Sequence, residues 1–408
     1  ANAFGSLSIS ILGEPLKQPA DQTADPAVRA EIEELNAKSQ FVLDDGASTR
    51  FAGGNDTNNK LVPPYVSATG EFAVGASVEF VEDVIVDYRN NAWTLNPTHQ
   101  IKTAATGVET ALPIKATWEM PAVADLGGDL KVGGFNIENY FPTTLGKAWS
   151  EAHPEAGCTY YADNTGEPVA INRCAAVTGK DPAGNDVTVN NPRGAWDAAM
   201  LEYQTQRITT AINDLDPDAL GIMELENSYL MSFGDPAQAD ASSKYLVEAL
   251  NKAAGVEGKW DYVPHNPDKQ EPIANQDVIR PAIIFQPAKV TAVEDGQLTL
   301  ADQSGPDQAF SNARAPFGQL FTPVDGGKPF FLVANHFKSK SPGSAEGENT
   351  DQGEGAWNPS RIAQAKALVD WANGPAMVEL KDATGIDVED VILAGDFNSY
   401  TFEKPMTT

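Results

Sequence analysis

Four apolar runs in the chain end at polar side chains of types that take part in phosphate chemistry. The runs are Leu130–Ile137, Ala219–Met223, Phe330–Ala334 and Val391–Ala394. The polar residues at or just beyond their ends are Asn136, Glu224, Asn335, His336, Asp396 and Asn398. Because ligands in α/β folds collect beyond the carboxyl ends of strands, these four ends can converge on one site.

Such a site would combine carboxylates, an imidazole and amides. Phosphodiester hydrolysis needs an oxygen-ligated metal, a donor at the phosphate, a carboxylate that orients water, and amides that stabilise negative charge. Each residue alone also has a structural explanation, such as a hydrogen-bonded strand end for His336 or a turn for Gly395–Asn398. Only the combination of these residues therefore indicates phosphoester hydrolysis.

Strands alternating with helices would position these residues. From Asp129 onward, apolar strands are separated by helical patterns, which predicts a layered α/β domain over 129–408. Two core-facing helices are expected, over 195–215 before Pro217 and over Ser360–Asn373.

The first part of the chain has a different pattern, with short strands separated by turns. The strands are expected at Leu7–Leu12, Gln40–Leu43 and Ala76–Tyr88, with a short amphipathic helix over Ala27–Ala37. This pattern predicts a small β-barrel or sandwich over 1–118, followed by a linker over 119–128.

The composition excludes two classes of protein. The chain has 57 Asp and Glu against 28 Lys and Arg, a formal net charge of −29. It has no run near the ~18 uninterrupted apolar residues of a membrane-spanning helix, and its 41% hydrophobic content is too high for a disordered chain. The charge argues against a protein that binds DNA by charge alone. A metal held between acidic ligands and phosphate would remove this objection, and a solvated acidic surface remains the simpler explanation of the charge.

Cys158 and Cys174 lie in one polar segment. A disulfide between them would stabilise the fold by about 3 kcal/mol on the chain-entropy estimate. Two free thiols are the alternative, but exposed thiols are reactive. The disulfide is the favoured interpretation, and it indicates an oxidising compartment.

An acidic loop over Ser339–Gly355 lies between His336 and Trp357. Its carboxylates belong to Glu346, Glu348, Asp351 and Glu354. A hard cation such as Ca²⁺ could order this loop. The spacing matches no EF-hand, so a flexible acidic loop is the alternative.

Over Asp129–Tyr400 the chain resembles the endonuclease/exonuclease/phosphatase superfamily, and within it the bacterial extracellular endonucleases of the ExeM/NucH type. The matching segments, in order, are Gly134–Phe141, Arg193–Ala195 followed by Gln206, Gly221–Asn227, Asn335–Lys340, Trp357–Asn358 with Arg361 and Gln364–Ala365, and Gly395–Asn398. The N-terminal part is similar to the OB-like domain of that family, through Leu16–Ala20, Leu43–Gly46 and Trp93–Thr98. The resemblance implies a DNase I-like four-layer α/β sandwich preceded by a small β-rich OB-like domain.

The resemblance also implies roles for the strand-end residues. Glu224 would be the direct metal ligand, for Mg²⁺ or Mn²⁺, and Asn136 would help to set the geometry of metal and phosphate. His336 would contact the scissile phosphate or serve as the acid. Asp396 and Asn398 would orient the nucleophile and stabilise the developing negative charge.

Local cations would contact the substrate phosphates. We expect this role for Arg193, Lys338 and Arg361, together with the amide of Asn335. Surface salt bridging is the alternative explanation of the three cations.

The family completes its site with an Asp-His pair near the C-terminus, and this chain has no counterpart, because its last histidine is His336. We therefore expect the chain to be a piece of a longer protein, its catalytic domain C-terminally incomplete, with little or no activity of its own.

The function expected from these observations is that of a secreted, metal-dependent endonuclease that hydrolyses extracellular DNA, or RNA, with little sequence specificity. The absence of a basic recognition helix or finger motif supports the lack of specificity. A phosphomonoesterase or phospholipid diesterase on the same fold is one alternative, and a noncatalytic surface or matrix protein is another. The sequence indicates no protein partner.

Overall fold

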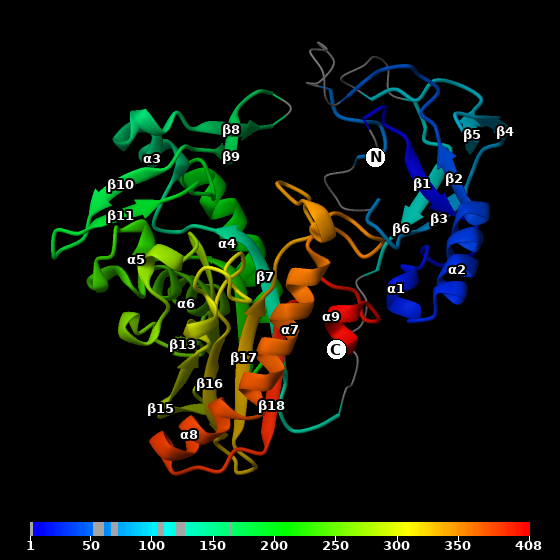
Figure 1. The fold of residues 1–408 in the computed structure, drawn as a ribbon. Helices are drawn as coiled ribbons and strands as arrows, with labels where there is room; N and C mark the ends of the chain where they lie inside the picture. Colours follow the sequence, from blue (N-terminus) through cyan, green and yellow to red (C-terminus); the bar gives the residue numbers. More distant parts are fainter. Residues whose placement is uncertain (1–2, 52–60, 67–71, 104–109, 120–126, 164) are drawn as a thin grey trace. The chain divides into compact units, whose positions relative to one another are not determined.

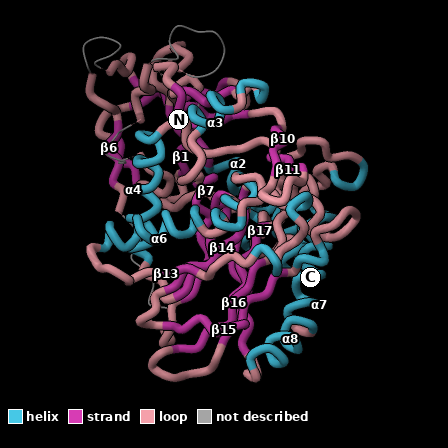
Figure 2. The backbone as a smooth tube through the Cα atoms, turned by 90° about the vertical axis from the view of Figure 1, so that its left-hand side faces the viewer, coloured by secondary structure: helices cyan, strands magenta, loops and turns pink. Residues whose placement is uncertain are grey.

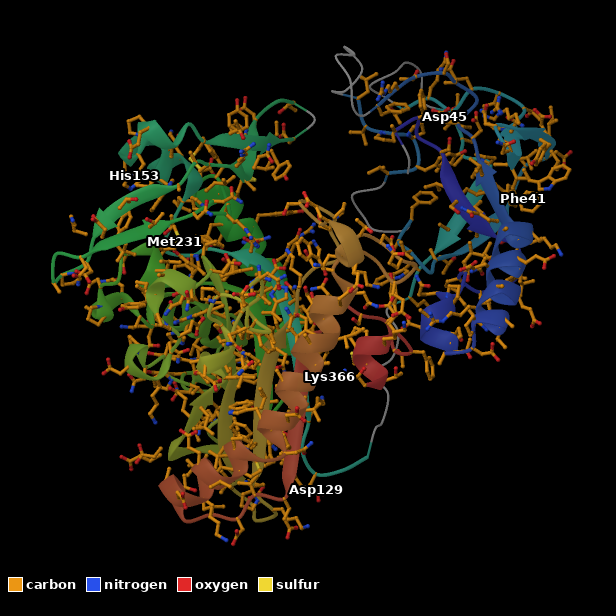
Figure 3. All side chains as sticks on the ribbon, viewed as in Figure 1. Phe41, Asp45, Asp129, His153, Met231 and Lys366 are labelled. Carbon is orange, nitrogen blue, oxygen red and sulfur yellow. A yellow bond between two sulfur atoms is a disulfide. The ribbon has the colours of Figure 1, made fainter. Side chains whose placement is uncertain are left out.

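The structure is a computed structural model that describes residues 3–51, 61–66, 72–103, 110–119, 127–163 and 165–408. The chain divides into two compact units. The first comprises Ala1–Ala124 with Ala162–Glu167, and the second comprises Asp125–Tyr161 with Pro168–Thr408. In Figure 3, Phe41 and Asp45 belong to the first unit, whereas Asp129 and Lys366 belong to the second. None of the helices in the described ranges combines the length and the apolar character needed to cross a membrane.

The first unit contains a four-stranded sheet in the order β1-β2-β5-β4 and a separate pair, β3 with β6. The elements are β1 (Leu7–Ser10), α1 (Pro19–Gln22), α2 (Pro26–Ser39), β2 (Gln40–Leu43), β3 (Ser77–Phe80), β4 (Val84–Arg89), β5 (Ala92–Pro97) and β6 (Ile114–Thr117). Leu43, Tyr65 and Leu95 are buried in its core. The OB-like character of this unit remains a prediction. Most of the predicted linker 119–128 lies outside the described residues.

The second unit is built on two four-stranded sheets. The first sheet has the order β13-β14-β12-β7 and the second the order β15-β16-β17-β18. The strands are β7 (Val132–Tyr140), β12 (Ala219–Glu226), β13 (Asp261–Tyr262), β14 (Ile279–Phe285), β15 (Val290–Thr299), β16 (Phe317–Pro323), β17 (Phe330–His336) and β18 (Asp390–Asp396). Two pairs are parallel, β12 with β7 and β17 with β18.

The two sheets pack face to face, and helices cover their outer faces. Between the sheets, Ile283 and Phe285 meet Phe321, Phe330 and Leu332 in one apolar cluster. A second cluster lies between the first sheet and the helices α4 (Ala198–Leu215) and α6 (Ala241–Ala254). A third joins the second sheet to α7 (Asn358–Ala372) and α8 (Pro375–Thr384). The four-layer α/β sandwich that the resemblance implied is therefore confirmed. In Figure 1, α6 and α7 lie on opposite sides of β17, and Figure 2 shows α4 and α6 on one side of the strands and α7 and α8 on the other.

Short elements complete the second unit, and the last of them, a terminal helix, contacts α7. They are α3 (Gly146–Ala152), β8 (Thr159–Ala162), β9 (Pro168–Arg173), β10 (Val177–Lys180), β11 (Asp186–Val189), α5 (Ser228–Met231) and the terminal helix α9 (Lys404–Thr407). The strands form two hairpins, β8 with β9 and β10 with β11. One cluster buries Trp149 of α3, Ile171 of β9 and Val187 of β11 together, so the hairpins share a small core.

Candidate active site

Strand alternation brings three of the predicted site residues to the same space between the two sheets. In β17, Phe330, Leu332 and Ala334 face the opposite sheet. Since side chains alternate along a strand, His336 stands on that same face. Asp396 of β18 follows Ile392 and Ala394, which also face the opposite sheet. In the first sheet, Val132 of β7 also packs into this cluster, and Asn136, four residues later, points from the same face of the strand.

One glycine allows the two sheets to approach at this point, and a second allows β17 and β18 to pair closely. A Cβ on Gly134 of β7 would lie 2.8 Å from the backbone nitrogen of Gly395 in β18. Gly395 itself has φ near +149°, and a Cβ there would lie 2.1 Å from the carbonyl oxygen of Asn335. Any side chain at either position would collide with backbone. The close contact lets the Asn136 side chain reach Asp396 on the facing sheet.

Glu224 reaches the same space through an irregularity in β12. Leu220 and Ile222 of this strand pack against the outer helices. Alternation alone would point Glu224 the same way. However, the register with both neighbouring strands shifts around this position, and Glu224 adopts φ +68°. The extra residue leaves Leu225 in the helix-facing cluster and turns the carboxylate of Glu224 to the site. A left-handed glutamate within a strand is strained, which is a common feature of functional positions.

The Asn136 amide links the two carboxylates. Its Nδ2 donates to Glu224 Oε1 at 3.0 Å and to Asp396 Oδ2 at 3.1 Å. Its Oδ1 accepts from the backbone of Glu138 at 2.9 Å, and the backbone of Asn139 donates to Glu224 Oε2 at 2.9 Å. Asn136 therefore orients both carboxylates. Its oxygen accepts one backbone hydrogen bond, as do the oxygens of Glu224 and Asp396, so the metal roles predicted for Glu224 and Asn136 both stay predictions.

His336 faces both carboxylates from the second sheet. Its Nε2 lies 3.8 Å from Glu224 Oε1 and 3.9 Å from Asp396 Oδ2, too far for a direct hydrogen bond to either. The ring is buried, and burial, reinforced by Arg314 and Arg193, lowers the pKa of His336 well below its usual value. In this state the imidazole is uncharged at neutral pH and can donate one hydrogen bond.

Asn398 lies in the turn after β18. Its backbone N–H donates to Asp396 Oδ1 at 2.9 Å, and its side-chain amide donates to the carbonyl of Phe337 at 3.1 Å. The residue has φ +48°. This turn fixes the Asp396 carboxylate and ties it to the end of β17. The predicted strand-end residues Asn136, Glu224, His336, Asp396 and Asn398 are thus brought together.

Two of the three predicted cations lie beside this group. Lys338 follows His336 by two positions, and its Nζ lies 5.3 Å from the ring centroid of Trp357. Burial, with Arg314 and Arg193 nearby, lowers the pKa of Lys338. Arg193 Nη1 donates to Asn139 Oδ1 at 3.2 Å.

The structure adds two residues that the sequence patterns did not single out. Arg314 pairs with Asp277 at 2.7 Å, and Arg193 approaches the same Asp277 oxygen at 3.9 Å. Neither new residue ends an apolar run, because Asp277 precedes β14 and Arg314 precedes β16. An arginine just before a buried strand was the only available signal.

The structure corrects the predicted role of Asn335. This residue precedes His336 in β17 and therefore stands on the opposite, helix-facing side of the strand. Its side chain is fully buried and donates to the carbonyls of Val333 at 2.8 Å and Ala394 at 3.1 Å. Asn335 holds the ends of β17 and β18 together and is not placed to contact a phosphate.

Arg361 is corrected in the same way. Its guanidinium is 0% exposed and donates to the carbonyls of Ala356 at 2.7 Å, Glu354 at 2.9 Å and Lys338 at 3.3 Å. These bonds close the acidic loop onto the start of α7. The residue shapes the loop and does not present a charge to substrate.

The acidic loop already uses two of its carboxylates for protein contacts. Asp351 Oδ1 accepts from the backbones of Gly353 at 2.8 Å and Gly355 at 2.9 Å. Glu354 Oε2 accepts from Asn358 at 3.0 Å and from the backbone of Lys404 at 3.1 Å. Structural Ca²⁺ in this loop stays a prediction.

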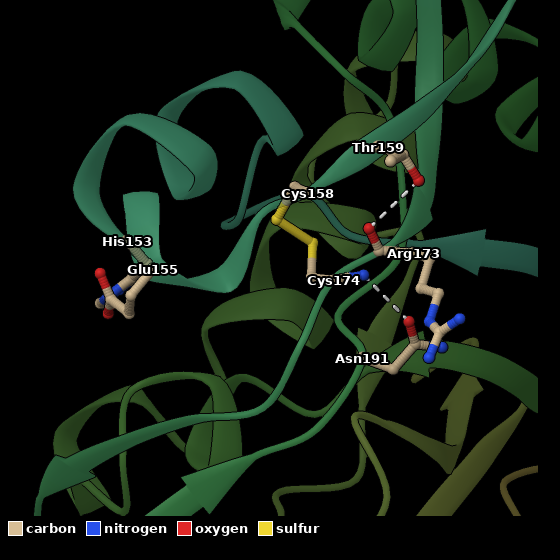
Figure 4. Close-up of a disulfide and its surroundings, with 7 residues drawn as sticks. All are labelled: His153, Glu155, Cys158, Thr159, Arg173, Cys174 and Asn191. Carbon is tan, nitrogen blue, oxygen red and sulfur yellow. Dashed lines mark hydrogen bonds and ion pairs between the residues drawn. A yellow bond between two sulfur atoms is a disulfide. The ribbon is translucent and has the colours of Figure 1, made fainter.

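The predicted disulfide is present. Cys158 and Cys174 are bonded at a sequence separation of 16, which anchors the base of the β8–β9 hairpin (Figure 4). The backbone N–H of Cys174 also donates to Asn191 Oδ1 at 3.2 Å. This hydrogen bond ties the base of the hairpin to Asn191, in the segment that precedes Arg193.

The donor set fits a hard divalent cation. Glu224 and Asp396 offer carboxylate oxygens on facing strands, held by one amide. Mg²⁺ commonly binds through one or two carboxylates and substrate phosphate, and it keeps several waters. Within the described residues, no group of three or more His, Cys, Asp and Glu side chains could hold a metal by itself. Glu224 and Asp396 could therefore supply two carboxylate ligands to such a cation, and the metal itself stays a prediction.

No family model and no curated protein matches the chain, but solved structures do. An endonuclease/exonuclease/phosphatase family protein from Bacteroides thetaiotaomicron is 19% identical, with 50% of this chain and 58% of that chain covered and a TM-score of 0.32. A mannosyl-6-phosphatase from the same organism is 15% identical, with 68% and 69% covered and a TM-score of 0.34. The human nocturnin catalytic domain is 15% identical, with 50% and 61% covered and a TM-score of 0.29. The chain spans less than two thirds of the length of the first and third of these proteins.

Proposed function

We propose that this protein is a metal-dependent phosphodiesterase that hydrolyses extracellular DNA, with RNA as a second possible substrate, using Mg²⁺ or Mn²⁺. One observation carries the proposal: the carboxylates of Glu224 and Asp396 share the amide of Asn136 and face the uncharged imidazole of His336. Arg193 and Arg314 act electrostatically on both His336 and Lys338.

The metal would be held by Glu224 and Asp396. When bound, it supplies charge stabilisation to the phosphoryl oxygens as a Lewis acid. Asn136 keeps the two carboxylates in fixed orientation. The network thus pre-organises the ligands.

The remaining side chains act on the substrate phosphate. His336 offers a neutral N–H to a phosphate oxygen, a contact that strengthens as negative charge develops. Arg193, Arg314 and Lys338 provide cationic contacts that position the phosphodiester in an acidic protein. Contacts of this kind carry no sequence information, which supports cleavage with little sequence specificity.

Substrate class is tested by an assay with four substrates. Plasmid DNA, RNA, p-nitrophenyl phosphate and sphingomyelin are incubated with the full-length protein in Mg²⁺, Mn²⁺, Ca²⁺ or EDTA, because the 408-residue chain is expected to have little activity of its own. Metal-dependent loss of DNA, alone or with RNA, supports the proposal. Hydrolysis of p-nitrophenyl phosphate alone would support a phosphomonoesterase, and hydrolysis of sphingomyelin alone would support a phospholipid diesterase. Inertness toward all four substrates would support a noncatalytic protein.

The metal assignment is tested by Glu224→Gln, which keeps the shape and removes the charge. We expect hydrolysis to fall by about a hundredfold or more, because even outer partners of metal ligands contribute 10- to 100-fold. The measurement is the initial rate of plasmid cleavage in Mg²⁺, with Glu248→Gln on the exposed face of α6 as the matched control. Full activity of Glu224→Gln would contradict the assignment.

A further inference from the structure

Asp277 brings two arginines together, and one of them, Arg193, contacts Asn139 beside Glu224. One of its oxygens, Oδ2, lies 2.7 Å from Arg314 Nη2 and 3.9 Å from Arg193 Nη2. Both arginines are close enough to lower the pKa of His336, and both also act on Lys338. The two guanidinium groups therefore share one carboxylate at the edge of the candidate active site.

The Asp277 carboxylate and its backbone make further hydrogen bonds. Its other oxygen, Oδ1, accepts from the backbone of Val278 at 2.7 Å. The carbonyl of Asp277 accepts from Asn227 Nδ2 at 3.1 Å, and the backbone of Asn227 donates to the carbonyl of Val278 at 2.8 Å. Asn227 directly follows β12, the strand that carries Glu224. The position of Asp277 is thus tied to the metal-ligand strand.

Arg193 is linked to Glu224 through Asn139. Its Nη1 donates to Asn139 Oδ1 at 3.2 Å, and the backbone of Asn139 donates to Glu224 Oε2 at 2.9 Å. The side chain of Arg193 is 33% exposed and that of Arg314 is 12% exposed, so both retain a surface that a ligand can contact. Two long side chains are ordered here before any substrate arrives.

We propose that Asp277 is a positioning residue that holds Arg193 and Arg314 as a guanidinium pair for one substrate phosphate. This rests on the proposed function, which identifies the phosphate as part of a nucleic-acid phosphodiester. Arginine presents a planar fork that matches phosphate oxygens. Fixing two such forks in advance removes the entropy cost of ordering them during binding.

The proposal predicts the direction in which phosphate affinity changes in Asp277→Asn, and a role in charge balance alone predicts the opposite direction. A carboxylate next to a phosphate site repels the phosphate, so an Asp277 that only balanced charge would weaken binding, and Asp277→Asn would then bind phosphate more tightly. A positioning role predicts weaker binding in the same variant, because the arginines lose their common anchor. The direction of the change therefore decides between the two roles.

The experiment measures the dissociation constant for inorganic phosphate in EDTA, by ³¹P NMR titration of the full 408-residue chain. We expect about tenfold weaker binding for Asp277→Asn, since one hydrogen-bonded charge contact is worth roughly that factor. Asp277→Glu should recover most of the affinity. Asp382→Asn, at an exposed position of α8, is the matched control. Unchanged or tighter phosphate binding in Asp277→Asn would overturn the proposal.

Kinetics and stability separate positioning from a general structural effect. On DNA, Asp277→Asn should raise KM by more than it lowers kcat, with little change in the thermal midpoint or in Mn²⁺ affinity. If Asp277→Asn does not fold, Arg314→Lys provides the test, because it keeps the charge and removes the fork. Phosphate affinity equal to wild type in Arg314→Lys would then overturn the proposal. If no substrate is hydrolysed but phosphate binding still depends on Asp277, the proposed function fails and the positioning role stands.

Discussion

Asn136 is the residue on which the metal-free geometry depends most directly. Its amide is the common donor to Glu224 and Asp396, two carboxylates from different sheets. Without a cation, the hydrogen bonds from this amide are what offset the repulsion between the two carboxylates. Removing it leaves two acceptors with one fewer partner each.

Asn136→Ala should therefore lower the free energy of unfolding of the metal-free protein by about 1–3 kcal/mol. Saturating Mg²⁺ should recover part of this loss, because a cation bound to the folded state stabilises it by mass action. Urea denaturation in EDTA and in Mg²⁺ measures both effects, with Asn373→Ala at the exposed end of α7 as the control. Equal stability of Asn136→Ala and wild type in EDTA would show that the bridge contributes nothing.

The residue-level errors of the sequence prediction have a common physical cause. Asn335 and His336 are neighbours, yet a strand points them to opposite faces, and only His336 faces the other sheet. Arg361 stands at helical spacing with the buried residues Gln364, Ala365 and Leu368, so the period of α7 turns it inward. Both positions could have been assigned correctly from periodicity.

Arg314 and Asp277 could not have been assigned in that way. Their pairing joins residues that are distant in the sequence and belong to segments without regular structure. No period relates such segments, so only the folded chain reveals the contact.

At the scale of elements, the β8–β9 hairpin supports the placement of Arg193. The backbone of Ile171 in β9 donates to the carbonyl of Gly194, and the backbone of Trp196 donates to the carbonyl of Val169. The disulfide between Cys158 and Cys174 fixes the base of this hairpin. The bridge therefore acts on the site through the strand beside Arg193.

Replacing both cysteines by alanine should lower the free energy of unfolding by about 3 kcal/mol, the chain-entropy value for a loop of this length. The looser hairpin should also raise KM for DNA more than it lowers kcat, because the role proposed for Arg193 is to position the substrate phosphate. Urea midpoints and steady-state kinetics measure these effects, and wild type treated with dithiothreitol should behave like the double variant. A double variant with unchanged stability would contradict the prediction.

The sequence located most of the elements that carry the site, because apolar runs mark buried strands directly. β12 begins at Ala219 and β17 begins at Phe330, as expected. The run Ala76–Tyr88 was expected as one strand but forms β3 and β4, which pair with different partners, β6 and β5. The irregularity at Glu224 was also not predictable, since a register shift arises from pairing between strands and leaves no local pattern.

At the scale of the whole molecule, the acidic charge and the candidate site have opposite effects on the binding of a polyanion. The net charge of −29 repels a polyanion, whereas the site offers a few local cations and a pair of carboxylates that suit a divalent metal. Nucleic-acid affinity normally comes from cations that displace counterions along the backbone. In this protein the contribution must be local, and a bound metal would supply the part that the surface lacks.

The protein should therefore need divalent cation to bind DNA as well as to cleave it. With a phosphorothioate duplex that resists hydrolysis, we expect binding in Mg²⁺ to be at least about tenfold tighter than in EDTA, since one additional charge contact is worth roughly that factor. The salt dependence should be shallow, with a slope of log affinity against log salt of about −3 for three phosphate contacts. Fluorescence anisotropy at several salt concentrations measures both quantities, and Glu224→Gln should lose the Mg²⁺ effect while Glu248→Gln keeps it. Tight binding in EDTA with a steep salt slope would instead indicate an extended cationic surface, and the metal would then serve only the chemical step.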